Sequence, residues 1–215
     1  MNEVIQNITI YAIPVIFAIT LHEAAHAFAA RYFGDSTAYM MGRMTLNPVK
    51  HIDPVWTILV PLVFVLLNSS FVFGAAKPVP LNIGALRNPK RDMIWVAAAG
   101  PMANLVMLVM WAILLKIVAG PGASMPATFL SYVAVAGMKV NVLLMALNLF
   151  PLLPLDGGRI LEGMLPNALS RKYAKLEPYG MFILIFLIFS HALDYFVLPL
   201  AHFSLKAVYS LIGLS

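Results

Sequence analysis

The sequence predicts an all-α polytopic membrane protein, and two observations support this fold class. Of the 215 residues, 61% are hydrophobic and only 11% are charged, whereas a soluble domain is about half apolar and about a quarter charged. The apolar residues gather in blocks long enough to cross a bilayer. Cysteine is absent, which excludes disulfides and thiolate metal ligands. We therefore expect a single transmembrane domain over residues 1–215, without a cleavable signal peptide.

The apolar blocks follow one another along the chain with short connections. The first predicted span covers residues 8–32 and the second covers 93–118. A short loop leads to a third span over 127–150, and a strongly apolar block predicts a fourth span over 178–194. The tail over 195–213 is helical in pattern and fits either a final span or an interfacial helix.

The region between the first two spans predicts irregular structure. Residues 34–53 are polar and rich in turn formers, which suggests short strands or turns at the surface. The apolar run that follows is too short to cross a bilayer comfortably, and Pro61 interrupts it. We therefore expect residues 55–73 to form a re-entrant segment, and the alternative is that this segment crosses the membrane.

The basic residues predict the orientation of the chain. Most lysines and arginines fall in the segments 31–50, 77–91 and 159–175, whereas Lys116 and Lys139 flank the opposite loop. Cytoplasmic segments of membrane proteins carry an excess of lysine and arginine. All three basic segments can lie on the cytoplasmic side if the segment between the first two of them enters the membrane and returns.

His22, Glu23 and His26 form the pattern H-E-x-x-H inside the first predicted span. Residues four apart share one face of a helix, so both imidazoles can reach one metal ion. Glu23 lies beside them as a candidate general base for a water molecule activated by the metal. The alternative is a pair of buried histidines bonded to helix carbonyls. Because ionisable side chains within lipid are costly, the pattern favours a functional site.

Two histidines leave such a site one protein ligand short, since a catalytic zinc usually has three. Asp156 is the leading candidate, because it follows two prolines and precedes two glycines in the stretch PLLPLDGG after the third span. Irregular backbone at membrane depth is tolerated only where it is buried in protein or lines a wet cavity. An ordinary turn with a solvated aspartate is the alternative. Asp194 is a competitor without this context, and the loop residue His51 is more typical of a structural histidine.

Three motifs in this order make the chain resemble the site-two protease family of intramembrane zinc metalloproteases. They are HEAAH at 22–26, GPMAN at 100–104 and N-x-x-P-x-x-P-x-D-G at 148–157. The resemblance implies a catalytic core of three transmembrane helices with extra helices around it. The chain resembles the compact branch of the family, since neither a PDZ domain nor a nucleotide-sensing domain is recognisable in it.

The resemblance also implies roles for particular residues. One zinc ion is expected to bind His22, His26 and Asp156, and Glu23 is expected to activate the water. Asn148, which opens the third motif, is the expected contact to the substrate backbone. In the second motif, Asn104 is a weaker candidate for substrate binding or for support of the metal ligands.

These expectations combine into a functional hypothesis. We expect a zinc metalloendopeptidase that hydrolyses a peptide bond in or near a transmembrane segment of a membrane-protein substrate. Its surroundings are expected to be the lipid bilayer of a prokaryotic plasma membrane, with the active site toward the cytoplasmic side and no nucleic-acid partner. The alternative is a non-proteolytic zinc-binding membrane protein, a metal carrier or a scaffold. Glu23 separates the two hypotheses, because a carrier does not need a general base.

Overall fold

The computed structural model describes residues 2–54, 59, 77–119 and 128–213, and these residues form helices joined by turns. Four helices are long and apolar enough to cross a membrane. These are α1 (Asn2–Tyr32), α4 (Pro89–Ala119), α5 (Phe129–Asn148) and α9 (Asp194–Ile212). No strand occurs among the described residues. The prediction of an all-α polytopic membrane protein is confirmed.

The remaining helices are short and connect or cover the long ones. They are α2 (Thr37–Met40), α6 (Asp156–Met164), α7 (Asn167–Ala174) and α8 (Glu177–Phe189), together with the 3-10 helices η1 (Pro48–Lys50) and η3 (Ile83–Ala85).

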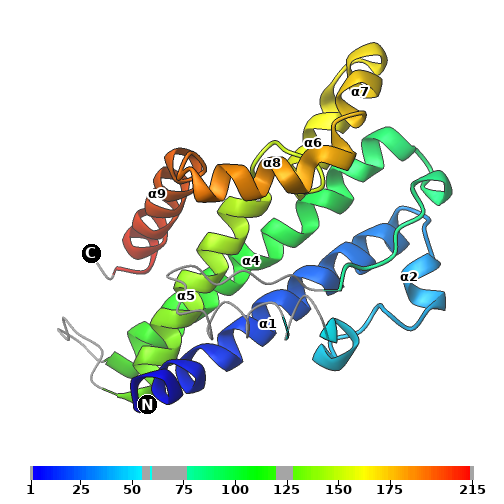
Figure 1. The fold of residues 1–215 in the computed structure, drawn as a ribbon. Coiled ribbons are helices and arrows are strands. Elements are labelled where there is room, and N and C mark those ends of the chain that lie inside the picture. The colour runs from blue at the N-terminus through cyan, green and yellow to red at the C-terminus, as the bar shows by residue number, and fades with distance from the viewer. Residues whose placement is uncertain (1, 55–58, 60–76, 120–127, 214–215) are drawn as a thin grey trace.

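Helices α1, α4 and α5 pack side by side and form the core of the molecule (Figure 1). Helix α4 contacts both of the others, and α1 also contacts α5. Small residues allow this close packing. A Cβ atom at Gly137 of α5 would lie 2.3 Å from the Trp111 ring of α4, so glycine is needed where the indole crosses α5. Leu108, Met138 and Val142 belong to the buried cluster between α4 and α5.

The C-terminal part of the chain differs from the predicted span over 178–194. Helix α8 has 13 residues, and at about 1.5 Å per residue it is roughly 20 Å long, shorter than the hydrocarbon core of about 30 Å. A turn follows in which His191 has a positive φ of 56°, a backbone conformation that ends a right-handed helix. Helix α8 lies across the end of the core, and α9 then runs back beside α5 (Figure 1). Of the two alternatives for the tail, length and composition favour the span.

Of the two structures expected after α1, strands or turns, the described residues form turns. Turns and short helices form here, and η1 packs against α1. Pro48 and His51 line a small cavity with Val15 and Thr20 of α1, although Thr20 lies roughly 18 Å from the Tyr32 end of that helix at about 1.5 Å per residue. The connection therefore runs back along α1 instead of staying at its end. The predicted re-entrant segment over 55–73 lies outside the described residues, except for residue 59.

Candidate metal centre

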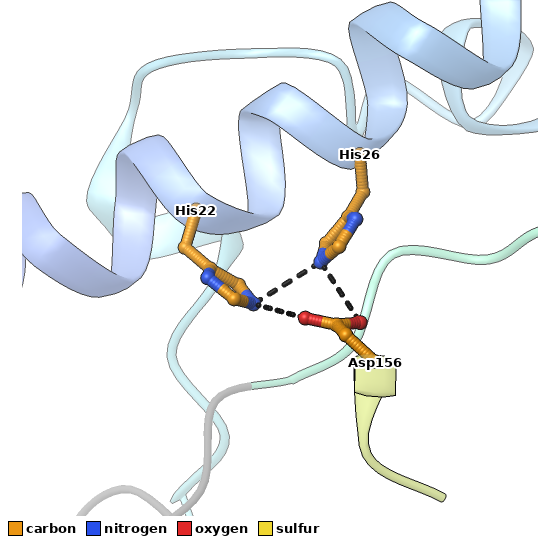
Figure 2. Close-up of side chains that lie close together, drawn as sticks. All are labelled: His22, His26 and Asp156. Carbon is orange, nitrogen blue, oxygen red and sulfur yellow. Dashed lines mark hydrogen bonds and ion pairs between the residues drawn. The ribbon is translucent and has the colours of Figure 1, made fainter. Parts of the chain in front are cut away.

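Three potential metal ligands from two distant parts of the chain meet beside the core. His22 and His26 project from α1, and Asp156 is the first residue of α6 (Figure 2). The Nε2 atoms of the two histidines are 3.1 Å apart. The Oδ2 atom of Asp156 lies 3.2 Å from Nε2 of His22, and its Oδ1 atom lies 3.4 Å from Nε2 of His26. In the described part of the chain, this is the one group of histidine and acidic side chains with metal-binding proximity.

The spacing of these atoms fits a tetrahedral zinc site. Zinc binds imidazole nitrogen and carboxylate oxygen at about 2.0–2.2 Å, which puts neighbouring ligand atoms roughly 3.3–3.6 Å apart in a tetrahedron. The observed separations of 3.1, 3.2 and 3.4 Å are close to that value. The Oδ2 atom of Asp156 is also buried without a hydrogen bond among the described residues. A buried carboxylate oxygen with this geometry is available as a metal ligand.

Each histidine ring is held by its other nitrogen. Nδ1 of His22 lies 2.7 Å from Oδ1 of Asn104, and Nδ1 of His26 lies 2.8 Å from the main-chain oxygen of Val96. Both partners accept hydrogen bonds, so the proton of each neutral ring is assigned to Nδ1. Nε2 then keeps its lone pair and points it at the site, which is the usual arrangement of metal-binding histidines.

Asn104 supports His22 from inside the core. Its side chain is 0% exposed. Its Nδ2 atom donates to Oδ1 of Asn141 at 2.9 Å, and Asn141 in turn donates to the main-chain oxygen of Gly137. The three contacts link α1, α4 and α5 through one polar chain. A side chain buried in this way offers no surface to a substrate. Of the two roles expected for Asn104, its position therefore fits support of His22 and not contact with a substrate.

Gly100 is a site residue whose role the sequence did not reveal, although it opens the GPMAN motif. A Cβ atom there would lie 2.4 Å from Nε2 of His26 and 2.6 Å from Cε1 of His22. Glycine therefore permits α4 to approach the two imidazoles. The sequence did contain an indication of this role. Gly100 lies four residues before Asn104, and this spacing puts both residues on the face of α4 that meets α1.

Asp156 is held at the site by a tight turn between α5 and α6. A Cβ atom at Gly157 would lie 2.3 Å from the main-chain oxygen of Leu149, so the start of α6 packs directly on the end of the preceding segment. The ionised carboxylate is the form of this side chain that binds a metal ion.

A cavity of about 400 Å³ opens beside the three ligands. Glu23, Asn148 and Arg159 line it together with His22, His26 and Asp156. The Oε2 atom of Glu23 accepts a hydrogen bond from the main-chain N–H of Val79 at 2.8 Å. Asn148 uses its Nδ2 atom to donate to the main-chain oxygen of Leu144 at 3.0 Å. The expected base and the expected substrate contact thus face the same space as the ligands.

The competing candidates lie elsewhere. His51 is 1% exposed, and its Nε2 atom lies 2.9 Å from the main-chain oxygen of Thr45. Asp194 lies at the start of α9 and pairs with the exposed His191 at 3.0 Å. A larger cavity of about 790 Å³ between α1 and α4 is lined by apolar side chains alone and offers no ligand atoms. The chemistry is therefore centred on the smaller cavity.

Fold and site together define an integral membrane protein whose buried helices carry a metal-ligand cluster, and comparison with known proteins supplies the family. The model of peptidase family M50 matches residues 114–191, which contain Asn148 and Asp156. The chain is 38% identical to "Putative zinc metalloprotease YwhC" of Bacillus subtilis (strain 168), over 86% of the chain and 82% of that protein. The chain belongs to peptidase family M50, the site-two protease family.

More distant relatives are longer than this chain. The chain is 32% identical to "Putative zinc metalloprotease Rip2" of Mycolicibacterium smegmatis over 83% of the chain and 66% of that protein. The Rip2 protein of Mycobacterium tuberculosis (strain ATCC 25618 / H37Rv) is 28% identical over 80% of the chain, which spans 62% of that relative. No solved structure matches the chain.

Proposed function

We propose that the protein is an intramembrane zinc endopeptidase that hydrolyses a peptide bond in or near a transmembrane segment of another membrane protein. The observation that carries this proposal is the position of Glu23 in the same cavity as His22, His26 and Asp156. Membership of peptidase family M50 and the zinc metalloprotease names of the relatives support it.

In this proposal, His22 and His26 each provide an Nε2 atom and Asp156 provides its carboxylate to one zinc ion. A zinc ion held by these three side chains would polarise the scissile carbonyl and lower the pKa of the attacking water. The hydrogen bonds of Asn104 and Val96 keep both imidazoles in the orientation that binding needs.

The side chains around the ligands provide the remaining chemistry. Glu23 takes the proton from the attacking water and delivers it to the amine that leaves. Asn148 hydrogen-bonds to the backbone of the substrate and keeps it extended beside the ligands. An extended substrate is needed because a helix satisfies its carbonyl groups internally and keeps them from the attacking water.

The depth of the ligands agrees with an intramembrane reaction. At about 1.5 Å per residue, His26 and His22 lie roughly 9 and 15 Å from the Tyr32 end of α1. The basic residues near that end, such as Arg31 and Arg43, favour a cytoplasmic location for it. We therefore place the active site in the cytoplasmic half of the plasma membrane.

The test replaces Glu23 by glutamine, which keeps the shape of the side chain and removes the base. Membrane proteins from cells that produce the wild type, E23Q or no enzyme are compared by mass spectrometry for cleaved fragments. We expect at least one membrane protein to be cut by the wild type alone, while purified E23Q binds as much zinc as the wild type. Identical fragments with the wild type and E23Q would exclude the proposed role of Glu23. Uptake of zinc by cells that produce the wild type, without any cleaved membrane protein, would favour a metal carrier.

A further inference from the structure

A segment without helix or strand, residues 77–82, lines the cavity of the candidate metal centre and contacts Glu23. The main-chain N–H of Val79 donates to Oε2 of Glu23 at 2.8 Å. Among the described residues, no second hydrogen bond reaches this carboxylate. A hydrogen bond to a charged acceptor is stronger than one between neutral groups, and here it fixes one of the two carboxylate oxygens.

The sequence of the segment makes Val79 the donor. Proline has no main-chain N–H, so Pro78 and Pro80 cannot donate, and Val79 between them provides the single N–H of this tripeptide. A residue before proline is also restricted to extended conformations, which limits the directions that this N–H can take. The side chain of Val79 is 7% exposed and packs with Ala27 of α1 and Ala38 of α2.

Contacts on both sides of Val79 hold the segment in place. Arg43 donates from Nη2 to the main-chain oxygens of Lys77 and Pro78, at 2.9 and 3.4 Å. On the other side, the main-chain N–H of Asn82 donates to Oδ2 of Asp35 at 2.7 Å. Asp35 is itself 1% exposed. The donor therefore belongs to a segment that is anchored before and after it.

We propose that the main-chain N–H of Val79 is a positioning group for Glu23. By holding Oε2, it directs Oε1 of the carboxylate toward the cavity and the three ligands. This inference rests on the proposed function, in which Glu23 moves a proton between the attacking water and the leaving amine. Without the bond the glutamate turns among several rotamers, and fewer molecules have the base in a reactive position.

The experiment removes the N–H from the full-length enzyme and compares two variants of Val79. Val79→Pro lacks the donor, and Val79→Ala keeps it while shortening the side chain. Cleavage of a membrane substrate that the wild type cuts and E23Q does not cut is measured in detergent micelles, together with zinc content. Since a misplacement of about 1 Å can cost about 100-fold in rate, we expect kcat of V79P to lie about 10- to 100-fold below that of V79A. KM and bound zinc are expected to be similar in both variants.

A second substitution guards against a folding defect in V79P. The α-hydroxy analogue of valine, incorporated at position 79 by cell-free translation, replaces the N–H by an ester oxygen and keeps the side chain. We expect the same loss in kcat with zinc retained. A kcat equal to that of the wild type in the ester variant would overturn the inference, and so would a rise in kcat, which would mean that the segment blocks the site.

The two proposals fail in different ways. If the wild type and E23Q cut the same proteins, the proposed function fails before Val79 is considered. If the wild type cuts a substrate that E23Q leaves intact, and the ester variant matches the wild type, the proposed function stands and the role of Val79 is wrong.

Discussion

The two sides of the candidate metal centre are built in different ways. The histidine side consists of packed helices: His22 and His26 lie on α1, and Gly100 and Asn104 of α4 contact them directly. The buried Asn141 of α5 extends these contacts across the core. Gly100 and Asn104 contact a histidine directly, and Asn141 is separated from His22 by Asn104 alone. A change on this side is therefore expected to act directly on the geometry of a ligand.

The aspartate side consists of an irregular turn that later parts of the chain support. A Cβ atom at Gly180 of α8 would lie 1.7 Å from the main-chain oxygen of Leu153, so α8 packs closely on the turn before Asp156. Tyr173 of α7 donates to the main-chain oxygen of Pro151 at 3.1 Å. More than one contact holds this turn in place. We therefore expect the loss of one exposed contact to reduce zinc affinity less than the loss of a contact on the histidine side.

The largest effect is expected when the aspartate side loses its ligand. In Asp156→Ala, two protein ligands remain, and we expect zinc content and cleavage to fall to background. Zinc per protein is measured by mass spectrometry on the purified full chain. Asp194→Ala is the matched control, because Asp194 pairs with His191 at the surface and should leave zinc content unchanged. Full zinc occupancy in D156A would exclude Asp156 as a ligand.

A smaller effect is expected from crowding the histidine side. In Gly100→Ala, the new Cβ atom meets Nε2 of His26 at 2.4 Å, and the ring is held by its hydrogen bond to Val96. Overpacking of this kind costs about 1–3 kcal/mol, and we expect zinc affinity to fall by roughly 10- to 100-fold. The control is Gly84→Ala, where the nearest atom, on Asn82, is 3.4 Å away. Unchanged affinity in G100A would show that the helices can separate freely.

Much of the site could be predicted because helical spacing and chain context are local signals. The i, i+4 spacing of His22 and His26 puts both rings on one face without knowledge of the fold. Asp156 was distinguished from Asp194 by its neighbouring prolines and glycines. The family resemblance then joined these motifs, and the structure brings the three side chains together.

The rest depends on contacts between segments that are far apart in the sequence. The bond between Val79 and Glu23 joins two such segments, and a main-chain donor leaves no mark in side-chain chemistry. The break between α8 and α9 was missed because the apolar run continues past His191, whose left-handed backbone is a property of the folded turn. Most of residues 34–53 are exposed or half-buried, as their polarity predicted, but the burial of His51 beside α1 depends on a contact that the sequence does not reveal.

The hydrogen bonds from His22 to Asn104 and from Asn104 to Asn141 allow a test of how the effect of a substitution falls with distance from the metal ligand. Asn104→Ala removes the direct partner of His22, and such losses typically cost about 10- to 100-fold in metal affinity. Asn141→Ala removes only the partner of Asn104, so we expect a smaller loss. Zinc affinity of both variants is measured by competition with a chelator. A larger loss in N141A than in N104A would contradict the proposed order of support.

The smallest effect is expected at the outermost support of the aspartate side. Tyr173→Phe removes a single hydroxyl that donates to Pro151 near the surface. A hydrogen bond contributes about 0.5–1.5 kcal/mol net, and here only the part transmitted through the turn reaches Asp156. We expect zinc affinity within about threefold of the wild type, measured by the same chelator competition. Gly180→Ala is the matched change at the closest contact of the same turn and should reduce affinity more. A tenfold loss of zinc affinity in Y173F would mean that the single contact between Tyr173 and Pro151 holds the turn. The aspartate side would then depend on individual contacts as much as the histidine side does.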